Sequence, residues 1–273
     1  MGQFDVMKQS KVPQTKTSLV RDLRSIGVSS GMTIIVHSSL KSIGWVVGGA
    51  VTVVAALQEV LTEEGTLIMP THSADVSDPR DWQNPSIPNE WIEEVMIEMP
   101  AYDPLRTPTF MIGAIPETFR TSPHVVRSNH PMHSFSVWGK NSAEVIKHHS
   151  LNHGLGEASP LSYIYDHEGS VLMIGTDYAT NTSMHLGEHR ADTQQKIIER
   201  MSPMMEDGQK VWKDFHELDY DEERFPEIGA KFEESYVVHT GNVGEATSKL
   251  LSQPALVDFT AIELTKLEGS EQN

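Results

Sequence analysis

The chain has 273 residues, which is long for one domain but within the size range of single α/β domains. Lys and Arg number 21 against 38 Asp and Glu, and the resulting net charge of −17 argues against binding of nucleic acid, whose phosphates it would repel. The chain contains no cysteine, which excludes disulfides, thiolate zinc sites and acetyl-cysteine intermediates.

The composition also bears on compartment and ligand. Residues 1–27 carry charges throughout and lack the apolar region of a signal peptide, and no apolar run approaches the roughly 20 residues that span a bilayer. We therefore expect a cytoplasmic protein without a membrane partner. An acidic surface attracts cationic ligands, although the same charge is also typical of proteins that acidic residues merely keep soluble.

The first part of the chain alternates helix and strand patterns. Apolar residues at helical spacing predict a helix over 15–26, and a β-branched run predicts a buried strand over 33–36. A strongly apolar stretch predicts a packed helix over 50–61, and the next strand is expected at 66–69. This strand–loop–helix–strand order is typical of a βαβ unit in a parallel sheet.

Residues 71–109 interrupt this alternation. The segment holds six prolines together with Trp82, Trp91 and Tyr102, and a flexible linker rarely carries two tryptophans. We therefore interpret it as a Pro- and Trp-rich excursion from the fold, with one short helix over 90–99.

The remaining elements continue the α/β pattern. Helices are expected at 113–120, 142–149, 160–165, 221–234 and 243–251. Strands are expected at 135–138 and 171–174, followed by a strand-rich stretch at 209–218. The last residues, 269–273, are expected to form a frayed tail.

A glycine-containing loop, residues 38–49, lies between the first predicted strand and the packed helix. A helix N-terminus presents unpaired N–H groups and a positive dipole end, and glycines let a ligand approach the backbone, so the loop is typical of a cradle for an anion or amide. It matches neither GxxxxGK[ST] nor GxGxxG, which disfavours a nucleoside triphosphate or a dinucleotide. An ordinary β–α connection is the alternative.

The densest polar cluster, residues 175–189, follows the last clear buried strand, at whose C-terminal end open α/β sheets usually place their ligands. A helix capped by Thr182 or Ser183 would carry the following polar side chains on one face. His185, Glu188 and His189 then fall at positions i, i+3 and i+4.

Two chemistries fit this face. The spelling HxxEH from His185 to His189 is the inverted zincin pattern, in which both imidazoles hold zinc and Glu188 acts as base. Alternatively, one imidazole oriented by a carboxylate acts as a general base, while a hydroxyl or backbone N–H steadies an oxyanion. A third interpretation is a helix start with surface histidines, since the chain has 13 of them.

Three segments, in this order, resemble the aminoglycoside 3-N-acetyltransferase family, also called the antibiotic N-acetyltransferase family. They are His37-Ser38-Ser39-Leu40 with Gly44 and Gly48-Gly49, then Arg127-Ser128-Asn129-His130-Pro131, then Asn181-Thr182-Ser183-Met184-His185-Leu186-Gly187-Glu188. The excursion beginning Met69-Pro70-Thr71-His72 and the segment Ala158-Ser159-Pro160-Leu161 also look like that family. The resemblance covers about residues 15–265 of what we expect to be one domain over 1–273.

The resemblance implies a three-layer α/β/α sandwich with a mostly parallel central sheet. It implies acetyl coenzyme A as donor, no metal, and the 3-amino group of a 2-deoxystreptamine aminoglycoside as acceptor, hence antibiotic resistance. A related N-acetyltransferase with a non-antibiotic amine acceptor is the second hypothesis within the family. A zinc hydrolase and a non-enzymatic module that sequesters a cation are the rivals outside it, and a homodimer is a further hypothesis.

The resemblance makes His185 the general base. The other catalytic residues are expected to be Glu188, Asp177 and Thr182. The cofactor-binding residues are expected to be His37, Ser38, Ser39, Leu40, Gly44, Gly48, Gly49, Ser128 and His130. The wall that receives the cationic acceptor is expected to include Asp75, Asp78, Trp82, Tyr102 and Asp103. Many members carry Asp where this chain has Ala179, so either Glu188 or Asp177 orients the imidazole.

Overall fold

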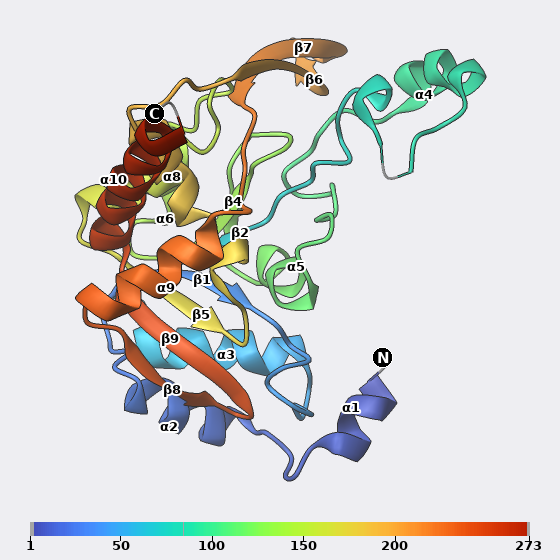
Figure 1. Cartoon of the computed structure of the whole chain (residues 1–273). Coiled ribbons are helices and arrows are strands. Elements are labelled where there is room, and N and C mark those ends of the chain that lie inside the picture. Colours follow the sequence, from blue (N-terminus) through green and yellow to red (C-terminus); the bar gives the residue numbers. More distant parts are fainter. Residues whose placement is uncertain (1–2, 84, 272–273) are drawn as a thin grey trace.

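The computed structural model describes residues 3–83 and 85–271 and centres on a seven-stranded sheet in the order β3-β4-β2-β1-β5-β9-β8. The sheet strands are β1 (Thr33–Ser38), β2 (Thr66–Pro70), β3 (Val126–Arg127), β4 (Phe135–Gly139), β5 (Ser170–Ile174), β8 (His239–Val243) and β9 (Ala246–Ser252). A separate hairpin of β6 (Ile197–Glu206) and β7 (Gln209–Leu218) stands at one end of the molecule (Figure 1).

The centre of the sheet is parallel and its flanks are antiparallel. Strand β1 pairs in parallel with β2 on one side and β5 on the other. Strands β4 and β9 then join β2 and β5 in antiparallel pairs. The βαβ unit predicted from the first strands is therefore confirmed, and the outer strands make the sheet as a whole mixed.

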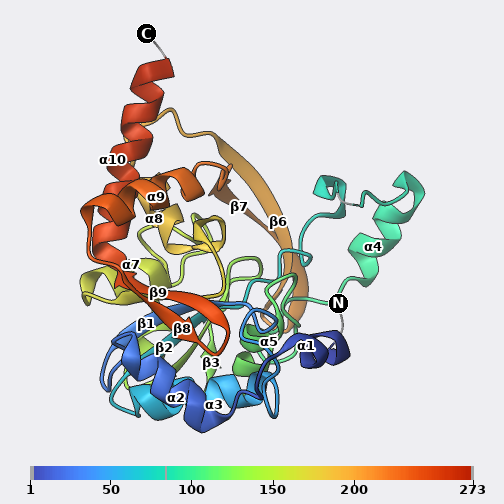
Figure 2. The same ribbon diagram turned by 60° about the horizontal axis from the view of Figure 1, so that its bottom comes forward.

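Helices cover both faces of the sheet, which confirms the α/β/α layering (Figure 2). One layer holds α2 (Lys16–Ser25), α3 (Ala50–Leu61) and α5 (Ala114–Arg120). The other holds α6 (Ser142–Lys147), α7 (Pro160–Asp166), α8 (Ser183–Arg190), α9 (Phe225–Ser235) and α10 (Gln253–Glu271), while α1 (Gln3–Gln9) lies outside both. Because side chains alternate along a strand, Ile34 and Val36 of β1 enter the first core and Ile35 enters the second.

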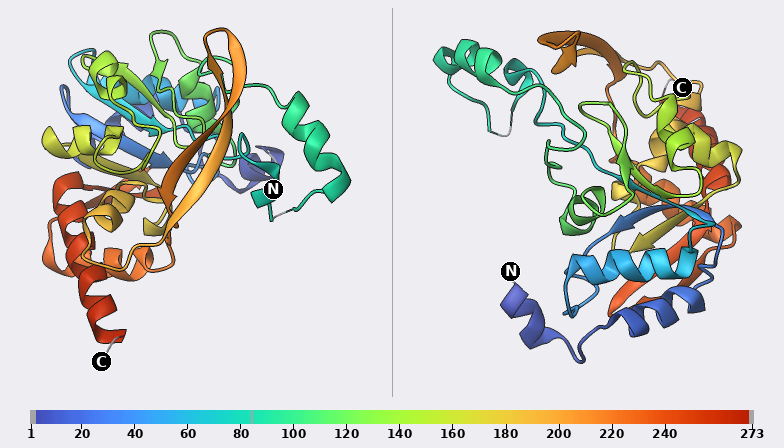
Figure 3. Two further views of the ribbon diagram at one scale, coloured as in Figure 1. Left: turned by 90° about the horizontal axis from the view of Figure 1, so that it is seen from above. Right: turned by 180° about the vertical axis from the view of Figure 1, so that it is seen from behind.

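The Pro- and Trp-rich segment is an excursion, as predicted, and it projects away from the sheet (Figure 3). It contains α4 (Ile92–Glu98) and the 3₁₀ turns η1 (Pro79–Asp81) and η2 (Asn89–Trp91). Its inner parts are tied to the hairpin by backbone hydrogen bonds from Asp78 N to Met201 O, 3.0 Å, and from Tyr102 N to Pro203 O, 2.8 Å.

Two predictions in the C-terminal half were wrong. The predicted helix at 243–251 is a β-hairpin, because Thr247 is exposed between buried Ala246 and Ser248 in the period-two pattern of a strand. The turn is made at Gly244, whose φ of +61° favours glycine. The expected frayed tail is also wrong as far as it is described, since α10 continues to Glu271, while residues 272–273 lie outside the described part.

Strand β6 was not predicted, although β7 was. Pro203 stands in the middle of β6, paired with Trp212, and proline normally argues against a central strand. In a two-stranded ribbon both strands are edge strands. On the outer side of the ribbon there is no neighbouring strand, so the N–H that Pro203 lacks costs no hydrogen bond of the ladder there. Among the described helices, none combines the length and apolar character that crossing a membrane requires.

Candidate active site

The C-terminal ends of the parallel strands β2, β1 and β5 meet at a cavity of about 390 Å³, here termed the central pocket. Its lining includes His37, Ser38, Pro70, Met111, Thr182 and Glu222. These residues come from the strand ends, the start of α8, the end of the excursion and the chain after β7. The polar cluster predicted from sequence therefore begins where α/β sheets place ligands.

His185 and Glu188 pair on α8, one helical turn apart. Nδ1 of His185 hydrogen-bonds to Oε2 of Glu188. Because a carboxylate only accepts, this contact assigns the imidazole proton to Nδ1 and leaves the Nε2 lone pair available. The other carboxylate oxygen, Oε1, accepts the backbone N–H of Asp221 at 3.0 Å. The two side chains are 15% and 13% exposed, so the pair is shielded yet reachable.

His37, which was expected to bind the cofactor, lines the central pocket together with Thr182, the residue that precedes α8. Burial, and to a lesser extent the charge of His185, lowers the pKa of His37 to about 3, so this imidazole is neutral. Within the described residues, neither His37 Nε2 nor Ser38 Oγ has a hydrogen-bond partner. Both residues line the central pocket, and their unpaired groups are buried at its wall.

Thr182 stands at the N-cap position of α8, as predicted, but its side chain makes no capping hydrogen bond. The side chain of Asn181 takes that part, with its Oδ1 accepting the N–H of Ser183 at 3.1 Å. Thr182 already has helical dihedral angles, φ −56° and ψ −26°, whereas a capping residue needs extended ones. Its side chain lines the central pocket instead.

Asp177 does not share this arrangement with Glu188. It is exposed and accepts the N–H of Ala179 at 3.1 Å, which caps the short 3₁₀ turn η3 (Tyr178–Thr180). It lines a shallow hollow beside Lys249 and Glu245 and is not among the residues that line the central pocket. Of the two predicted orienting carboxylates, the structure therefore pairs Glu188 with His185.

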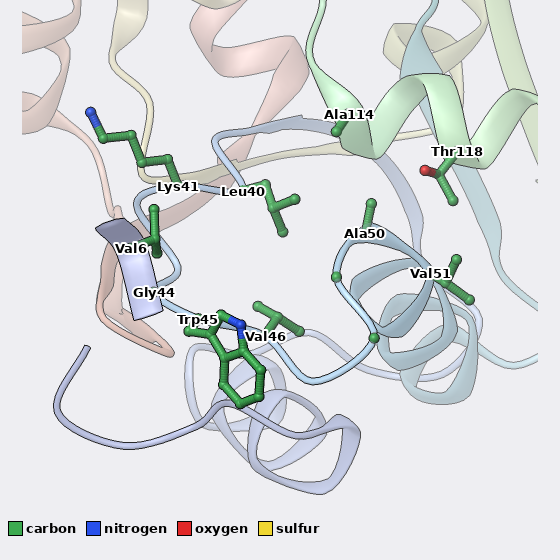
Figure 4. A pocket seen from close by; sticks show the side chains of 12 residues that line it. Val6, Leu40, Lys41, Gly44, Trp45, Val46, Ala50, Val51, Ala114 and Thr118 are labelled. Carbon is green, nitrogen blue, oxygen red and sulfur yellow. The ribbon is translucent and has the colours of Figure 1, made fainter. Parts of the chain in front are cut away.

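The glycine loop surrounds a second cavity, of about 710 Å³, here termed the loop pocket (Figure 4). Leu40, Gly44, Gly48 and Gly49 line it, as does the first turn of α3. Gly48 and Gly49 have φ of +82° and +61°, which only glycine adopts readily. Ser39 stays out of the pocket and braces the loop, because its Oγ accepts the hydroxyl of Ser42 at 2.8 Å.

Ser128 and His130 were predicted to contact the cofactor, and the structure places both side chains in the interior. Their exposed fractions are 1% and 0%. Ser128 Oγ bonds to the backbone N–H of Phe135 and to Nδ1 of His149, both at 2.9 Å. His130 Nδ1 accepts the backbone N–H of His133 at 2.9 Å. The segment is a buried turn whose polar groups are already satisfied.

Arg127 belongs to the same buried turn. Its guanidinium donates to the backbone carbonyls of Thr71 and Thr107, both at 2.5 Å, and to Ser134 Oγ at 3.0 Å. Burial lowers its pKa from the usual value. Arg127 therefore fastens the two ends of the excursion to the sheet.

The predicted acceptor wall divides into two groups. Tyr102 is 3% exposed and donates its hydroxyl to Ser128 O, and Asp78 is buried in an ion pair with Arg80, so neither is placed to meet a ligand. Asp75, Trp82 and Asp103 line a separate cavity of about 600 Å³, the excursion pocket. Burial raises the pKa of Asp75 from its usual value.

The two histidines of the HxxEH spelling have different hydrogen-bond partners in this fold. His185 Nδ1 is engaged by Glu188, whereas His189 Nε2 bonds to the hydroxyl of Tyr220 at 3.0 Å. Across residues 3–83 and 85–271, no group of three or more His, Asp or Glu side chains is arranged to hold a metal ion.

Several residues around His185 were missed by sequence reasoning. The rings of Tyr220 and Phe225 lie 4.7 and 5.0 Å from the imidazole, centroid to centroid. Glu222 brings a carboxylate to the central pocket from the same stretch. These residues follow β7 in sequence and carry no motif, so only the return of the hairpin to α8 reveals them.

Comparisons with known proteins identify the family of this chain. A family model described as aminoglycoside 3-N-acetyltransferase matches residues 35–265. The chain is 46% identical over 255 residues to the SPbeta prophage-derived aminoglycoside N(3')-acetyltransferase-like protein YokD of Bacillus subtilis (strain 168), with 93% of each chain covered. The crystal structure of YokD from Bacillus subtilis matches with a TM-score of 0.95 at 44% identity, over 99% of each chain.

More distant relatives match over nearly the whole chain. Aminoglycoside N(3)-acetyltransferase VII of Streptomyces paromomycinus is 32% identical over 289 residues, covering 100% of this chain and 99% of the relative. The solved structure of AAC-IIIb in a binary complex with CoASH has a TM-score of 0.85 at 29% identity, over 94% of this chain and 98% of that one. By sequence and by fold, this chain belongs to the aminoglycoside 3-N-acetyltransferase family of acyltransferases.

Proposed function

We propose that this protein transfers the acetyl group of acetyl coenzyme A to the 3-amino group of a 2-deoxystreptamine aminoglycoside. The observation that carries the proposal is the His185–Glu188 pair on α8, at the C-terminal ends of the parallel strands. The pair leaves Nε2 as the base, and family membership supplies the reaction class.

The proposed reaction is direct transfer within a ternary complex. Nε2 of His185 takes a proton from the acceptor ammonium, because a protonated amine has no lone pair with which to attack. The amine nitrogen then bonds to the thioester carbonyl carbon, and collapse of the tetrahedral intermediate breaks the carbon–sulfur bond. The products are the amide, the coenzyme A thiol and one proton. The Thr182 hydroxyl and backbone N–H groups are assigned to the oxyanion.

The loop pocket is suited to the donor. Val46 and Leu40 give it apolar walls, while Lys41 and the N-terminal turn of α3 supply positive charge for phosphates (Figure 4). A Cβ built at Gly49 meets no atom within 4 Å, so this bare backbone borders open space that a ligand can occupy. The fit supports coenzyme A as the occupant of the loop pocket.

The acceptor is assigned to the central pocket. Glu222 at its lining and the net charge of −17 favour a molecule that carries several ammonium groups. The excursion pocket, with Asp75 and Asp103, is proposed to extend this acidic wall. The carboxylates of Asp75 and Asp103 line the excursion pocket together with Met205 of the hairpin. They would therefore attract the acceptor electrostatically without contacting the amine that reacts.

The proposal is tested by incubating the protein with acetyl coenzyme A and a panel of aminoglycosides and simpler polyamines. Thiol release should occur with 2-deoxystreptamine aminoglycosides, and NMR of the product should place the acetyl group on the 3-amino nitrogen. Turnover of polyamines alone would favour the non-antibiotic hypothesis. Saturable acceptor binding without thiol release would favour the sequestering module, and activity that a chelator removes and zinc restores would favour the hydrolase.

Four further expectations stay predictions. They are the single domain over residues 1–273 with its core at about 15–265, the cytoplasmic location, the homodimer, and the absence of nucleic-acid and membrane partners.

A further inference from the structure

Two consecutive residues after β7 touch both members of the His185–Glu188 pair. The Tyr220 ring packs 4.7 Å from the His185 imidazole, with the planes inclined by 59°. The backbone N–H of Asp221 donates to Oε1 of Glu188 at 3.0 Å. The position of this dipeptide therefore determines how the Tyr220 ring packs against the imidazole of His185. It also determines the orientation of the Glu188 carboxylate that holds this imidazole.

The Tyr220 hydroxyl is fixed from two sides. It lies 2.9 Å from Oε2 of Glu217 and 3.0 Å from Nε2 of His189. A carboxylate only accepts, so the hydroxyl donates to Glu217 and accepts from the N–H of His189. Burial, followed by the charge of His153, lowers the pKa of His189 to about 4, so this imidazole is neutral. Burial and Glu217 together raise the pKa of Tyr220, which keeps it a phenol.

Glu217 is the buried end of this chain of hydrogen bonds. It is 1% exposed, and its carboxylate accepts the backbone N–H of Gly154 at 3.0 Å. Its Oε1 also lies 3.4 Å from Nε2 of His130. Burial acts to raise the pKa of Glu217, but the hydrogen bond from His130, the charge of His133 and the N–H of Gly154 outweigh it and hold the pKa below the usual value. A charged carboxylate with these partners is a rigid anchor.

The turn that contains His130 thereby gains a role in the site that does not involve the cofactor. At Gly154 a Cβ would lie 2.3 Å from His130 Nε2, so glycine lets the two segments close around Glu217. The buried turn contacts Glu217 of the hairpin directly, and α8 is joined to Glu217 through His189 and the Tyr220 hydroxyl. The result is positional: Glu217 holds Tyr220, and the ring of Tyr220 packs against His185.

We propose that Tyr220, anchored by Glu217 and His189, is a positioning residue that holds the His185–Glu188 pair in its reactive arrangement. The inference rests on the proposed role of His185 as base. Removal of the hydroxyl leaves a buried acceptor on Glu217 and a buried donor on His189 without their partner, and each such loss is costly enough to displace the segment. Asp221 N–H then withdraws from Glu188, and the imidazole proton is no longer confined to Nδ1.

The test compares Tyr220→Phe with a matched control, Tyr165→Phe. Tyr165 of α7 also donates its hydroxyl to a carboxylate, Asp258 of α10 at 2.8 Å. Its ring packs against Arg190 at the end of α8, not against the His185–Glu188 pair. We expect Tyr220→Phe to lower kcat by about 10-fold to 100-fold, the range typical of losing a residue that orients an active-site group through hydrogen bonds. The KM for acetyl coenzyme A should be unchanged. Tyr165→Phe should keep both values.

Nitrogen NMR of histidine-labelled protein supplies a reading that does not depend on turnover. In the parent protein the His185 signals should show the Nδ1–H tautomer, and in Tyr220→Phe they should move toward the average of the two tautomers. Glu217→Gln, which keeps the ring of Tyr220 but has only one accepting oxygen, should shift them in the same direction and serves if Tyr220→Phe does not fold. Unchanged His185 signals and kcat in a folded variant of either kind would overturn the inference.

The two proposals fail in different ways. If the tautomer shifts in Tyr220→Phe while His185→Ala retains turnover, the positioning role stands and the role of His185 as base is wrong. If His185→Ala is inactive and Tyr220→Phe matches Tyr165→Phe in both readings, the base stands and the positioning role is wrong.

Discussion

The loop pocket and the surroundings of His185 are built in opposite ways. The loop pocket takes most of its wall from one short stretch of sequence, in which glycines with positive φ lead directly into α3. The surroundings of His185 gather side chains from α8, from the end of β7 and from the turn after β3, and many of them are buried and titratable. A site formed by one segment can be predicted from the order of its residues, whereas a site assembled from several segments depends on how distant segments pack.

The first prediction exploits the buried histidines of the assembled region, which the loop pocket lacks. Burial is the largest cause that lowers the pKa of His72 and His149 to about 3, as it does for His37, and the pKa of His189 is about 4. The unfolded chain binds protons at these positions below about pH 6.5, whereas the folded chain does so only near pH 3–4, so stability falls as pH falls through this window.

Each such group weakens the fold by about 2 kcal/mol at pH 5 relative to pH 7. Urea unfolding at the two pH values should show a loss of several kcal/mol in the free energy of unfolding. His72→Asn, which removes one titrating ring, should show a smaller loss than the parent protein. Equal free energies at pH 7 and pH 5 would mean that these rings are accessible to protons in the folded state.

The second prediction concerns the carboxylate of the assembled site. Glu188→Gln keeps the shape and can still accept from Asp221, but its amide end no longer fixes the imidazole proton on Nδ1. We expect kcat to fall by about 100-fold, within the usual range for impaired general-base catalysis. Asp177→Asn is the comparison, because Asp177 caps an exposed turn, and it should change kcat little. A larger effect at Asp177 would reverse the assignment of the orienting residue.

The third prediction concerns the loop pocket alone. Ala114 is exposed at the start of α5 and lines that pocket, so Ala114→Trp should fill it without disturbing either core. Coenzyme A should raise the Tm of the parent protein by binding the folded state. In Ala114→Trp we expect that shift to disappear and the KM for acetyl coenzyme A to rise by about 10-fold, a loss of roughly 1.4 kcal/mol.

The control for this change is Ala143→Trp, which adds the same ring to an exposed position on α6 in the other layer. It should leave both the Tm shift and the KM as they are in the parent protein. A coenzyme A effect that survives in Ala114→Trp would move the donor site out of the loop pocket.

The smallest expected effect separates the central pocket from the excursion pocket. Glu222→Gln should raise the acceptor KM by a few-fold, since a partly exposed charge pair contributes roughly 1 kcal/mol or less. Asp103→Asn should raise it less, because Asp103 lines the excursion pocket and also accepts the N–H of Leu105. Added salt should weaken both contributions. An acceptor KM that is insensitive to salt and to both changes would mean that the acidic charge serves only solubility.

The same contrast explains how much the sequence could predict. Helix α3 and strands β1 and β2 carry strong local periods, and the boundaries of α3 match the predicted 50–61. The segment 243–251 failed because Ala246, Leu250 and Leu251 also satisfy helical spacing, and only pairing with β5 decides for a strand. Helical spacing placed His185 and Glu188 on one face, as the structure has them.

The partners of that pair were beyond sequence reasoning. Tyr220 and Glu217 lie about thirty residues farther along the chain, and the hairpin that returns them to α8 contains a strand that was not predicted. Ser128 and His130 were assigned to the cofactor because their residue types suit hydrogen bonding, yet burial commits them to the backbone. The residue type indicates that a side chain can form hydrogen bonds, and packing determines whether its partner is a ligand or another part of the protein.

The measurement that tests the central claim most directly is the turnover of His185→Ala beside a matched control, His167→Ala. His167 is exposed at the end of α7 and stacks on Tyr163, away from both pockets. Thiol release by His185→Ala should fall by about 10²–10⁴-fold while the coenzyme A-induced Tm shift is retained, and His167→Ala should match the parent protein. Near-normal thiol release by a folded His185→Ala protein would contradict the assignment of His185 as the base.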